Sequence, residues 1–226
     1  SGDRICYHGV MDMFRNPKLA ANIYACEQEQ TPVLEITSSM DIGEHPGCNR
    51  GNIYILSNAD SVKMYKNDRF IKEYRPEMSP YKHLKHGPIL IDDFIGDALE
   101  KNERFRPKHA KEMADAMNIV ARGSLNHIPK RLYPTALKLV LLYHIDFAEV
   151  TKLYTKYIGD WGGTATVYRF DAIKNGKVIK SVTKEPVNGI RLQAEADHTN
   201  LTEHHSYDVA LVRIRSVDAH GNVLPF

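Results

Sequence analysis

The stretch SNADSVKMYKNDRFIKEY, residues 57–74, contains two short segments of alternating polarity that meet at a turn. Val62 and Met64 alternate with polar residues, which is the period of two that places one apolar face of a strand on a core. Asn67 and Asp68 tolerate the left-handed backbone that a two-residue hairpin turn requires. The stretch therefore predicts a β-hairpin that serves as scaffold, since none of its residues looks reactive.

The composition is that of an ordinary globular protein. The 226 residues are 42% hydrophobic and 26% charged, with a formal net charge of +2. A charge this mild does not indicate a protein that binds nucleic acid or a polybasic protein of the membrane surface. The three cysteines, Cys6, Cys26 and Cys48, lack the paired spacing of a zinc site or a disulfide framework. We therefore expect free thiols, a reducing (cytoplasmic) compartment, and neither a metal nor another cofactor.

Strand patterns precede and follow a helical block. The early candidates are residues 32–37, 52–56, 61–66 and 69–74. The late candidates are a hairpin around Asn175-Gly176, an alternating strand in 189–197 and a largely apolar strand in 207–218 that we expect to be central. Neither group has enough strands to bury a good core by itself, so the sequence predicts one antiparallel sandwich.

The helical block and one earlier segment show the spacing of amphipathic helices. The predicted helices are 16–30, with Asn16 as N-cap and Pro17 in the first turn, then 89–101 and 107–122, one that begins after Pro134, and a further one that begins at Asp146. Residues 135–142 are apolar on most sides of the helix. We therefore predict that 135–158 is the buried centre of the block and that the block is seated on the sandwich.

Four stretches carry a resemblance to a known family: YHGVMDMFRNPKLAANIY (7–24), GNIYILSNADSVKMYKNDRFIKEY (51–74), WGGTATVYRFDAIKNGKVIKSVT (161–183) and SYDVALVRIRSVDAHGNVLPF (206–226). In this order they resemble the end of the catalytic barrel and the following sandwich of bacterial glycoside hydrolase family 2 enzymes, the β-galactosidase and β-glucuronidase group. The residues that match the family's SNADEVELYLNG pattern are Asn58, Ala59, Asp60, Val62 and Asn67. The helical block has no counterpart in most members and would be an insertion.

The resemblance implies an α+β fold with three parts. Residues 1–30 would be the last strand and helix of a TIM barrel. Residues 31–87 plus 160–226 would form an immunoglobulin-like antiparallel β-sandwich, and residues 88–159 a helical insertion. The whole would be the C-terminal region of a larger enzyme.

The resemblance also implies the chemistry of a retaining glycosidase, which needs two carboxylic acids about 5 Å apart. The family carries both acids on barrel strands that would precede this chain, so we expect no catalytic residue and no glycosidase activity in this chain alone. The expected role is accessory support of the barrel. Its partners would be the barrel and other domains of the same parent chain, the carbohydrate substrate and a second subunit, with no nucleic acid and no membrane.

Four residues are candidates for contact with the sugar. Asp41, Glu44 and His45 lie in a loop that follows the barrel-like segment and could reach the barrel's mouth, although ordinary loop polarity explains them as well. Trp161 could stack on a sugar face, but a single Trp at a helix-to-strand junction also fits a core position.

Other polar groups favour structural interpretations. Asp92-Asp93 is predicted to serve local structure, because adjacent residues on a helix point in different directions. The group of His198, Glu203, His204 and His205 lacks the spacing of a metal site and is predicted to be a solvated loop.

Two other classes of function stay open from the sequence. One is an independent carbohydrate-binding or adhesion module of immunoglobulin-like shape, which would need an exposed aromatic platform. The other is nucleic-acid binding by the helical block, suggested by its basic residues Lys108, Lys111, Arg122, Lys130 and Arg131. Interspersed acidic residues favour a solvated helix surface instead.

Overall fold

The computed structural model of the chain describes residues 8–13, 15–41, 49–123, 130, 134, 147–159 and 165–224. The chain divides into two compact units, Ser1–Glu185 and Pro186–Phe226.

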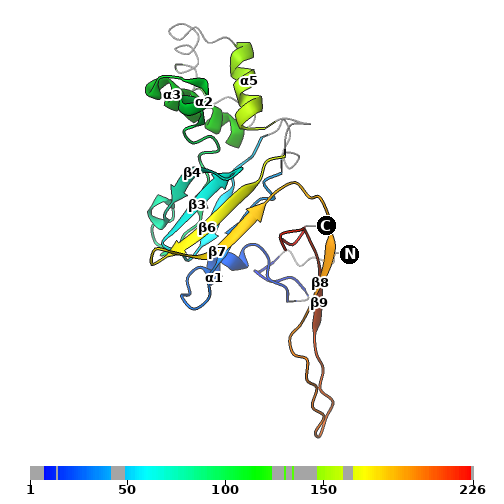
Figure 1. Cartoon of the computed structure of the whole chain (residues 1–226). Helices are drawn as coiled ribbons and strands as arrows, with labels where there is room; N and C mark the ends of the chain where they lie inside the picture. The colour runs from blue at the N-terminus through cyan, green and yellow to red at the C-terminus, as the bar shows by residue number, and fades with distance from the viewer. Residues whose placement is uncertain are drawn as a thin grey trace. The chain divides into compact units, whose positions relative to one another are not determined.

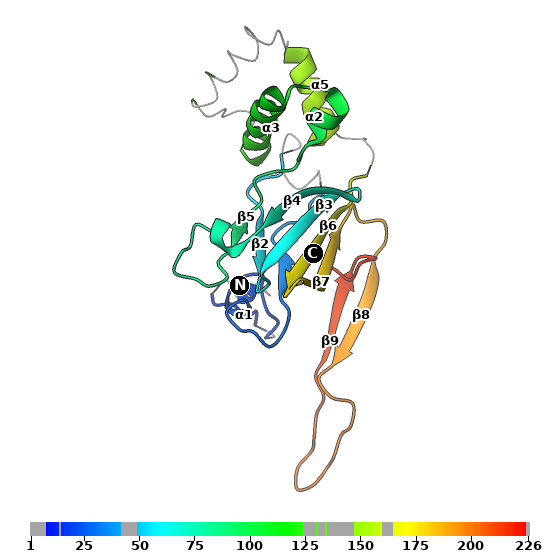
Figure 2. The same cartoon turned by 60° about the vertical axis from the view of Figure 1, so that its left-hand side comes forward.

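The first unit contains two antiparallel sheets (Figures 1 and 2). The three-stranded sheet has the order β1 (Leu34–Ile36), β2 (Tyr54–Ser57) and β5 (Ile89–Leu90). The four-stranded sheet has the order β4 (Arg69–Tyr74), β3 (Ser61–Lys66), β6 (Tyr168–Lys174) and β7 (Lys177–Lys184). The pairing of β3 with β6 joins strands from before and after the helical block in one sheet.

Both predicted hairpin turns are confirmed. Asn67 and Asp68 have φ values of 48° and 61°, and β3 pairs with β4 across them. Asn175 and Gly176 have φ values of 52° and 73° between β6 and β7. Positive φ at both central residues is the geometry that suits the right-handed twist of a hairpin.

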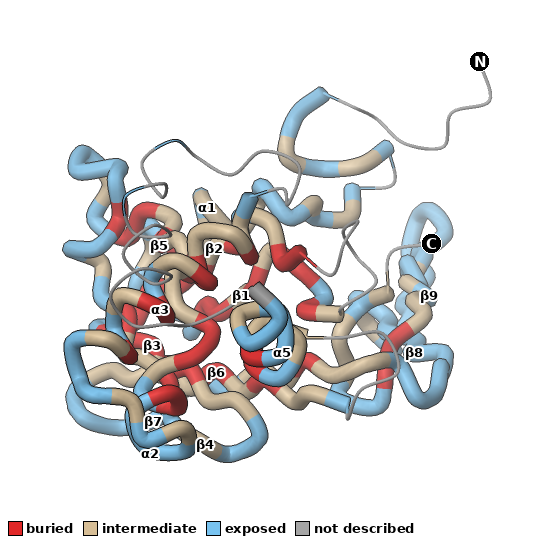
Figure 3. The backbone as a smooth tube through the Cα atoms, turned by 90° about the horizontal axis from the view of Figure 1, so that it is seen from above, coloured by how far each residue is buried: buried red, intermediate tan, exposed pale blue. Residues whose placement is uncertain are grey.

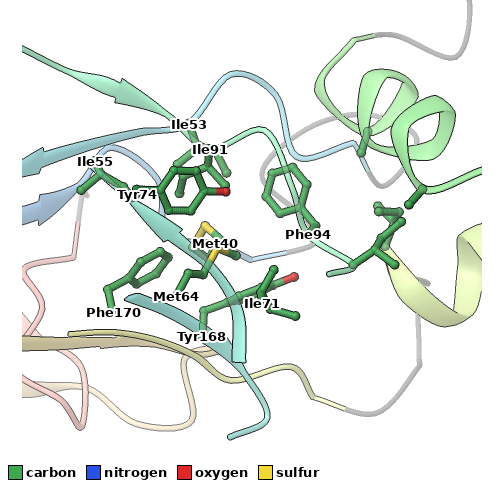
Figure 4. Close-up of a cluster of buried hydrophobic side chains, with 14 of the residues drawn as sticks. Met40, Ile53, Ile55, Met64, Ile71, Tyr74, Ile91, Phe94, Tyr168 and Phe170 are labelled. Atoms are coloured by element: carbon green, nitrogen blue, oxygen red, sulfur yellow. The ribbon is translucent and has the colours of Figure 1, made fainter. Parts of the chain in front are cut away.

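The two sheets share one hydrophobic core. The three-stranded sheet contributes Leu34, Ile36, Ile55 and Ile89, and the four-stranded sheet contributes Val62, Met64, Ile71, Tyr74, Tyr168, Phe170 and Ala172. Figure 4 shows several of these side chains facing one another between the strands. Two antiparallel sheets that bury their facing sides in this way make a β-sandwich.

Three α-helices lie together at one end of this sandwich (Figure 1): α2 (Ala98–Glu103), α3 (Pro107–Arg122) and α5 (Phe147–Tyr157). The prediction of a helix over 107–122 is confirmed, and Gly123 ends it with its N–H bonded to Ile119 O. The helix predicted after Pro134 falls on residues 135–146, which lie outside the described residues. The further helix, predicted to begin at Asp146, is confirmed by α5 from Phe147. Leu153, Tyr157 and Ile158 are buried and belong to the core of the first unit.

The prediction of a helix over 89–101 is wrong in its first half. Ile91, Phe94 and Ile95 are buried as expected, but α2 begins only at Ala98. The Asp93 carboxylate accepts hydrogen bonds from the N–H groups of Ile95 (2.9 Å) and Gly96 (3.0 Å), and a short polar side chain that bonds its own backbone in this way competes with a helix.

The predicted helix over 16–30 is also shorter than expected, because only α1 (Ala21–Ala25) forms. Asn16 does not cap it. Its N–H and its side-chain amide bind the carboxylate of Asp12 instead, and Pro17 pairs with Met11 in an isolated bridge. This turn holds the chain in an extended form where the sequence predicted the first turn of a helix.

The second unit is an antiparallel hairpin of β8 (Arg191–Ala196) and β9 (Val212–Val217). The predicted alternation in β8 is confirmed by its register with β9. The prediction that β9 is a central strand is wrong for the described part of the chain, where β8 is the one strand in a ladder with it. The end of β9 also forms an isolated bridge between Val217 and Val223, and Leu224 N–H donates to Ser216 O at 2.9 Å. The placement of residues 186–226 in the same sandwich as residues 31–87 stays a prediction.

Candidate functional site

Of the four candidate sugar contacts, only Asp41 is among the described residues. It is half-buried, and its N–H donates to Ser39 Oγ at 3.1 Å. Glu44, His45 and Trp161 lie outside the described residues.

A buried arginine connects the segments that carry these candidates. Arg50 is 3% exposed, and its guanidinium donates through Nη1 to Met40 O and through Nη2 to Ile158 O, both at 2.7 Å. Met40 immediately precedes Asp41, and Ile158 stands three residues before Trp161. The structure thus brings together the points from which both candidate-bearing segments start.

The same region holds the C-terminal ends of two helices. The backbone N–H groups of Arg50 and Gly51 donate to Ala121 O, near the end of α3, at 2.7 and 3.2 Å. Lys66 Nζ donates to Tyr157 O at the end of α5. The last carbonyls of a helix carry partial negative charge and lack helical partners, so cations and N–H groups stabilise them. This explains a buried arginine for which the described residues provide no carboxylate.

The Tyr168 ring completes this cluster. It lies 5.5 Å from Arg50 Cζ and 5.7 Å from Lys66 Nζ, within the range of cation–π attraction. We call Arg50, Lys66 and Tyr168 the helix joint. No sequence signal identified it, because an arginine in a loop before a strand is normally a solvated charge.

The adjacent carboxylates Asp92 and Asp93 have structural roles, as predicted, although neither lies on a helix. Asp92 receives two hydrogen bonds of 2.8 Å from Lys72 Nζ at the edge of a surface hollow. Asp93 also accepts from Asn118 Nδ2 at 2.9 Å, which links it to α3. Both carboxylates are therefore occupied by local partners.

A second hollow lies where the sandwich meets the helices, between Lys66, Phe94 and Tyr157. The charged groups on its rim are paired. Arg69 contacts Asp97 at 2.5 Å, and Lys156 contacts Glu103 at 2.6 Å. These pairs join β4 and α5 to α2, so the polar groups here are used for structure.

Glu29 lies at the centre of a charge cluster. Its carboxylate binds the ammonium groups of Lys174 and Lys85, and His86 Nε2 lies 3.5 Å away. Hydrogen bonds from Lys174 and Lys85 lower the pKa of Glu29 from 4.5 to about 2. The cluster ties the segment after α1 to the β6–β7 turn.

The histidine-containing loop shows no metal site. His198 Nδ1 lies 2.8 Å from Asp197 and its Nε2 lies 3.8 Å from Asp208, while His204 and His205 are exposed. Among the residues with described positions, no group of three His, Cys, Asp or Glu side chains could hold a metal ion. Cys26 is buried, and this burial raises the pKa of its thiol to about 12. The negative charge of Glu27 makes a smaller contribution in the same direction.

The segment that resembles the end of a barrel carries exposed apolar side chains. The exposed fractions are 42% for Met11, 57% for Met13, 45% for Leu19 and 71% for Tyr24. In the same segment, Ile23 and Ala25 pack on a small cluster of Cys26, Val33 and Leu56. We call Met11, Met13, Leu19 and Tyr24 the N-terminal apolar surface.

None of the helices in the described ranges has both the length and the apolar character needed to cross a membrane. The chain matches no family model. A β-galactosidase of Thermoanaerobacterium thermosulfurigenes is 39% identical over 95 residues, which are 41% of this chain and 13% of that protein. A β-galactosidase of Thermoanaerobacter pseudethanolicus is 37% identical over 92 residues, 39% of this chain and 12% of that protein.

Among solved structures, a β-glycosidase from Bacteroides vulgatus aligns with 96% of this chain and 18% of its own, with 12% identity and a TM-score of 0.48. The sequence matches show that part of this chain is related to glycosidases. They span about an eighth of the length of the β-galactosidases concerned.

Proposed function

We propose that this chain is the non-catalytic C-terminal accessory region of a family 2 glycoside hydrolase whose catalytic barrel hydrolyses O-glycosidic bonds. In this proposal the sandwich is immunoglobulin-like and the segment up to residue 30 completes the barrel. The identity to two β-galactosidases supports the relation to glycosidases. The catalytic carboxylates, the barrel and the sugar substrate would belong to the parent enzyme.

The observation that carries the proposal is the N-terminal apolar surface. Met13 and Tyr24 are more than half exposed, although other residues of their segment pack on a core. Several large apolar side chains exposed in one short segment favour a contact with another part of the protein. A barrel packed on this surface would bury them.

The matched pair Met13→Lys and Val178→Lys tests this contact in the parent-length enzyme. Both wild-type side chains are 57% exposed in this chain, so both substitutions introduce the same charge at equal exposure. We expect Met13→Lys to lower the temperature of half-inactivation of the glycosidase by several degrees and Val178→Lys to leave it unchanged. Equal effects of the two substitutions would contradict the contact.

The absence of catalysis is tested with the purified chain alone. Turnover of nitrophenyl galactoside or nitrophenyl glucuronide is expected to stay at the level of buffer. Turnover that co-purifies with the chain through successive columns, and disappears on denaturation, would refute the accessory role.

The proposal includes sugar contacts by Asp41, Glu44, His45 and Trp161 in the assembled enzyme. Support comes from Arg50, which holds the starting points of both segments within one hydrogen-bond network. We expect Glu44→Gln and Trp161→Ala to raise KM in the parent enzyme while melting temperature is retained. Glu77→Gln, at an exposed position of η2 (Pro76–Met78), is the control. Unchanged KM in both variants would remove these residues from the site.

One observation favours the second candidate function, an independent carbohydrate-binding module. On the outer face of the four-stranded sheet, Tyr65 and Phe70 meet edge to face at 5.8 Å, and Arg169 Cζ lies 4.4 Å from the Tyr65 ring centroid. Phe70 is 47% exposed and could stack on a sugar ring. Calorimetric binding of galactan by the chain, lost in Phe70→Ser, would favour this candidate.

A further inference from the structure

The β8–β9 hairpin has one apolar face, and this face is exposed. The register places six small or apolar side chains on it: Leu192, Ala194, Ala196, Val212, Ile214 and Ser216. Leu192 is 74% exposed, Ile214 66% and Val212 52%. Figure 3 shows β8 in pale blue along its length, in contrast to the red stretches of β3 and β6.

The opposite face of the hairpin is polar. It carries Arg191, Gln193, Glu195, Arg213 and Arg215, and at its end the one apolar residue Val217, which is buried. Arg215 Nη1 lies 3.5 Å from Glu195 Oε2, so these two charges pair within the hairpin itself. An antiparallel ribbon with one charged face and one apolar face is built to have water on one side and a second layer on the other.

The side chains of the apolar face also differ in size in a way that suits packing against another layer. Each cross-strand pair combines one larger and one smaller side chain: Leu192 with Ser216, Ala194 with Ile214, and Ala196 with Val212. Such alternation leaves hollows into which side chains of a facing layer can insert. The face carries no charge that a covering layer would have to desolvate.

The unpaired edge of β8 indicates that the layer covering the apolar face is a β-sheet. In the described part of the chain β8 pairs with β9 alone, so its outer edge offers unpaired N–H and C=O groups. A two-stranded hairpin is marginal in water, and further strands both satisfy the edge and cover the face. A helix would cover only the face.

We propose that this hairpin is part of a second β-sandwich, completed by an antiparallel sheet from another domain of the parent glycosidase. This proposal replaces the sequence-based prediction that residues 186–226 belong to the sandwich of residues 31–87. This inference rests on the proposed function, because it places the partner in the parent chain. The matched β-galactosidases have ample length for such a domain, since the matched residues are only 13% and 12% of them.

Hydrogen exchange tests the proposal by comparing peptides that cover residues 190–197 and 211–217 in this chain and in the parent-length polypeptide. We expect exchange in both peptides to be at least tenfold slower in the parent-length protein. Leu192→Lys on the apolar face should restore fast exchange there, while the neighbouring Gln193→Lys on the polar face should not. Circular dichroism of each variant of this chain confirms that the first unit is intact.

Three outcomes would overturn the proposal. Equal exchange in the two proteins would show that no layer covers the hairpin. Protection already present in the monomeric chain would place the covering layer in residues 1–185. Protection that increases with concentration, together with a dimer in light scattering, would identify a second copy. None of these results bears on the N-terminal apolar surface, so the accessory role would stand or fall separately by Met13→Lys.

Discussion

Strands β6 and β8 have the same alternating pattern and opposite environments. In β6, Tyr168, Phe170 and Ala172 are completely buried, whereas Leu192 in β8 is 74% exposed. The alternation decides which side chains share a face in both strands. Burial requires a second layer, and the described residues supply one for β6 but not for β8. Stability in this chain should therefore depend on the first unit.

The largest expected effect comes from comparing a core residue of the first unit with an exposed apolar residue of the second. Phe170→Ala removes a fully buried ring between the sheets and should lower the free energy of unfolding by about 3–5 kcal/mol. Leu192→Ala should change it by less than about 0.5 kcal/mol in this chain. Urea unfolding followed by circular dichroism measures both. Similar costs would show that the hairpin face is covered by the chain itself.

The second largest change in the free energy of unfolding is expected at the helix joint. Arg50→Met removes the donors to Met40 O and Ile158 O in a buried site and should cost about 2–3 kcal/mol. The matched control in the second unit is Arg215→Met, whose 3.5 Å pair with Glu195 is partly exposed and is worth less than about 1 kcal/mol. Hydrogen exchange should also become faster in α5 for the first variant only. An unchanged urea midpoint for Arg50→Met would show that the joint contributes nothing to stability.

A smaller effect is expected from two glycines. Gly96 has a φ of +60°, and an added Cβ would lie 3.2 Å from Ile71 O and 3.3 Å from Ile71 Cα. Gly96→Ala should therefore cost about 1–2 kcal/mol through backbone strain. Gly189, in the second unit, has open space around it, and Gly189→Ala should be neutral. Thermal unfolding of the two variants measures this difference. A melting temperature of Gly96→Ala equal to that of the wild type would contradict the prediction.

The smallest effect concerns pH. The folded chain lowers the pKa of Glu29 from 4.5 to about 2, mainly through Lys174 and Lys85. A carboxyl whose pKa is lower in the folded state stabilises the fold above its unfolded pKa, and this contribution is lost as the pH falls from about 4.5 toward 2. The urea midpoints of wild type and Glu29→Gln should therefore converge over that range. A constant difference between them would show that the cluster does not titrate in this way.

Much of the sandwich was predictable because its signals are local. Alternation identified β3, β4, β6 and β7, and the pairs Asn67-Asp68 and Asn175-Gly176 identified the turns between them. The helix over 107–122 was predictable from its apolar period and from Gly123. The helix over 16–30 was not, since a turn held by Asp12 replaced its first part.

The candidate site could be predicted only in part. The sequence pointed to two loops through Asp41 and Trp161, and the structure describes Asp41 alone. Arg50, which joins the starts of both loops, was missed because its partners lie 10 and 108 residues away in the chain. Both partners are backbone carbonyls, which a pattern of side chains does not reveal, and Ile158 also lies far outside a window of about 18 residues.

The sequence by itself determined the strand faces, the hairpin turns and the apolar stripe of α3, because each depends on residues close together in the chain. The tertiary structure decided that residues 91–97 are not helical, since Asn118 of α3 binds both Phe94 N and the Asp93 carboxylate, at 2.9 Å each. It also decided which cation is buried, because the Arg50 guanidinium donates to Ile158 O, at the end of α5, as well as to the nearer Met40 O. Burial and long-range hydrogen bonds depend on the second layer or element that covers a segment, and only the folded chain places that element.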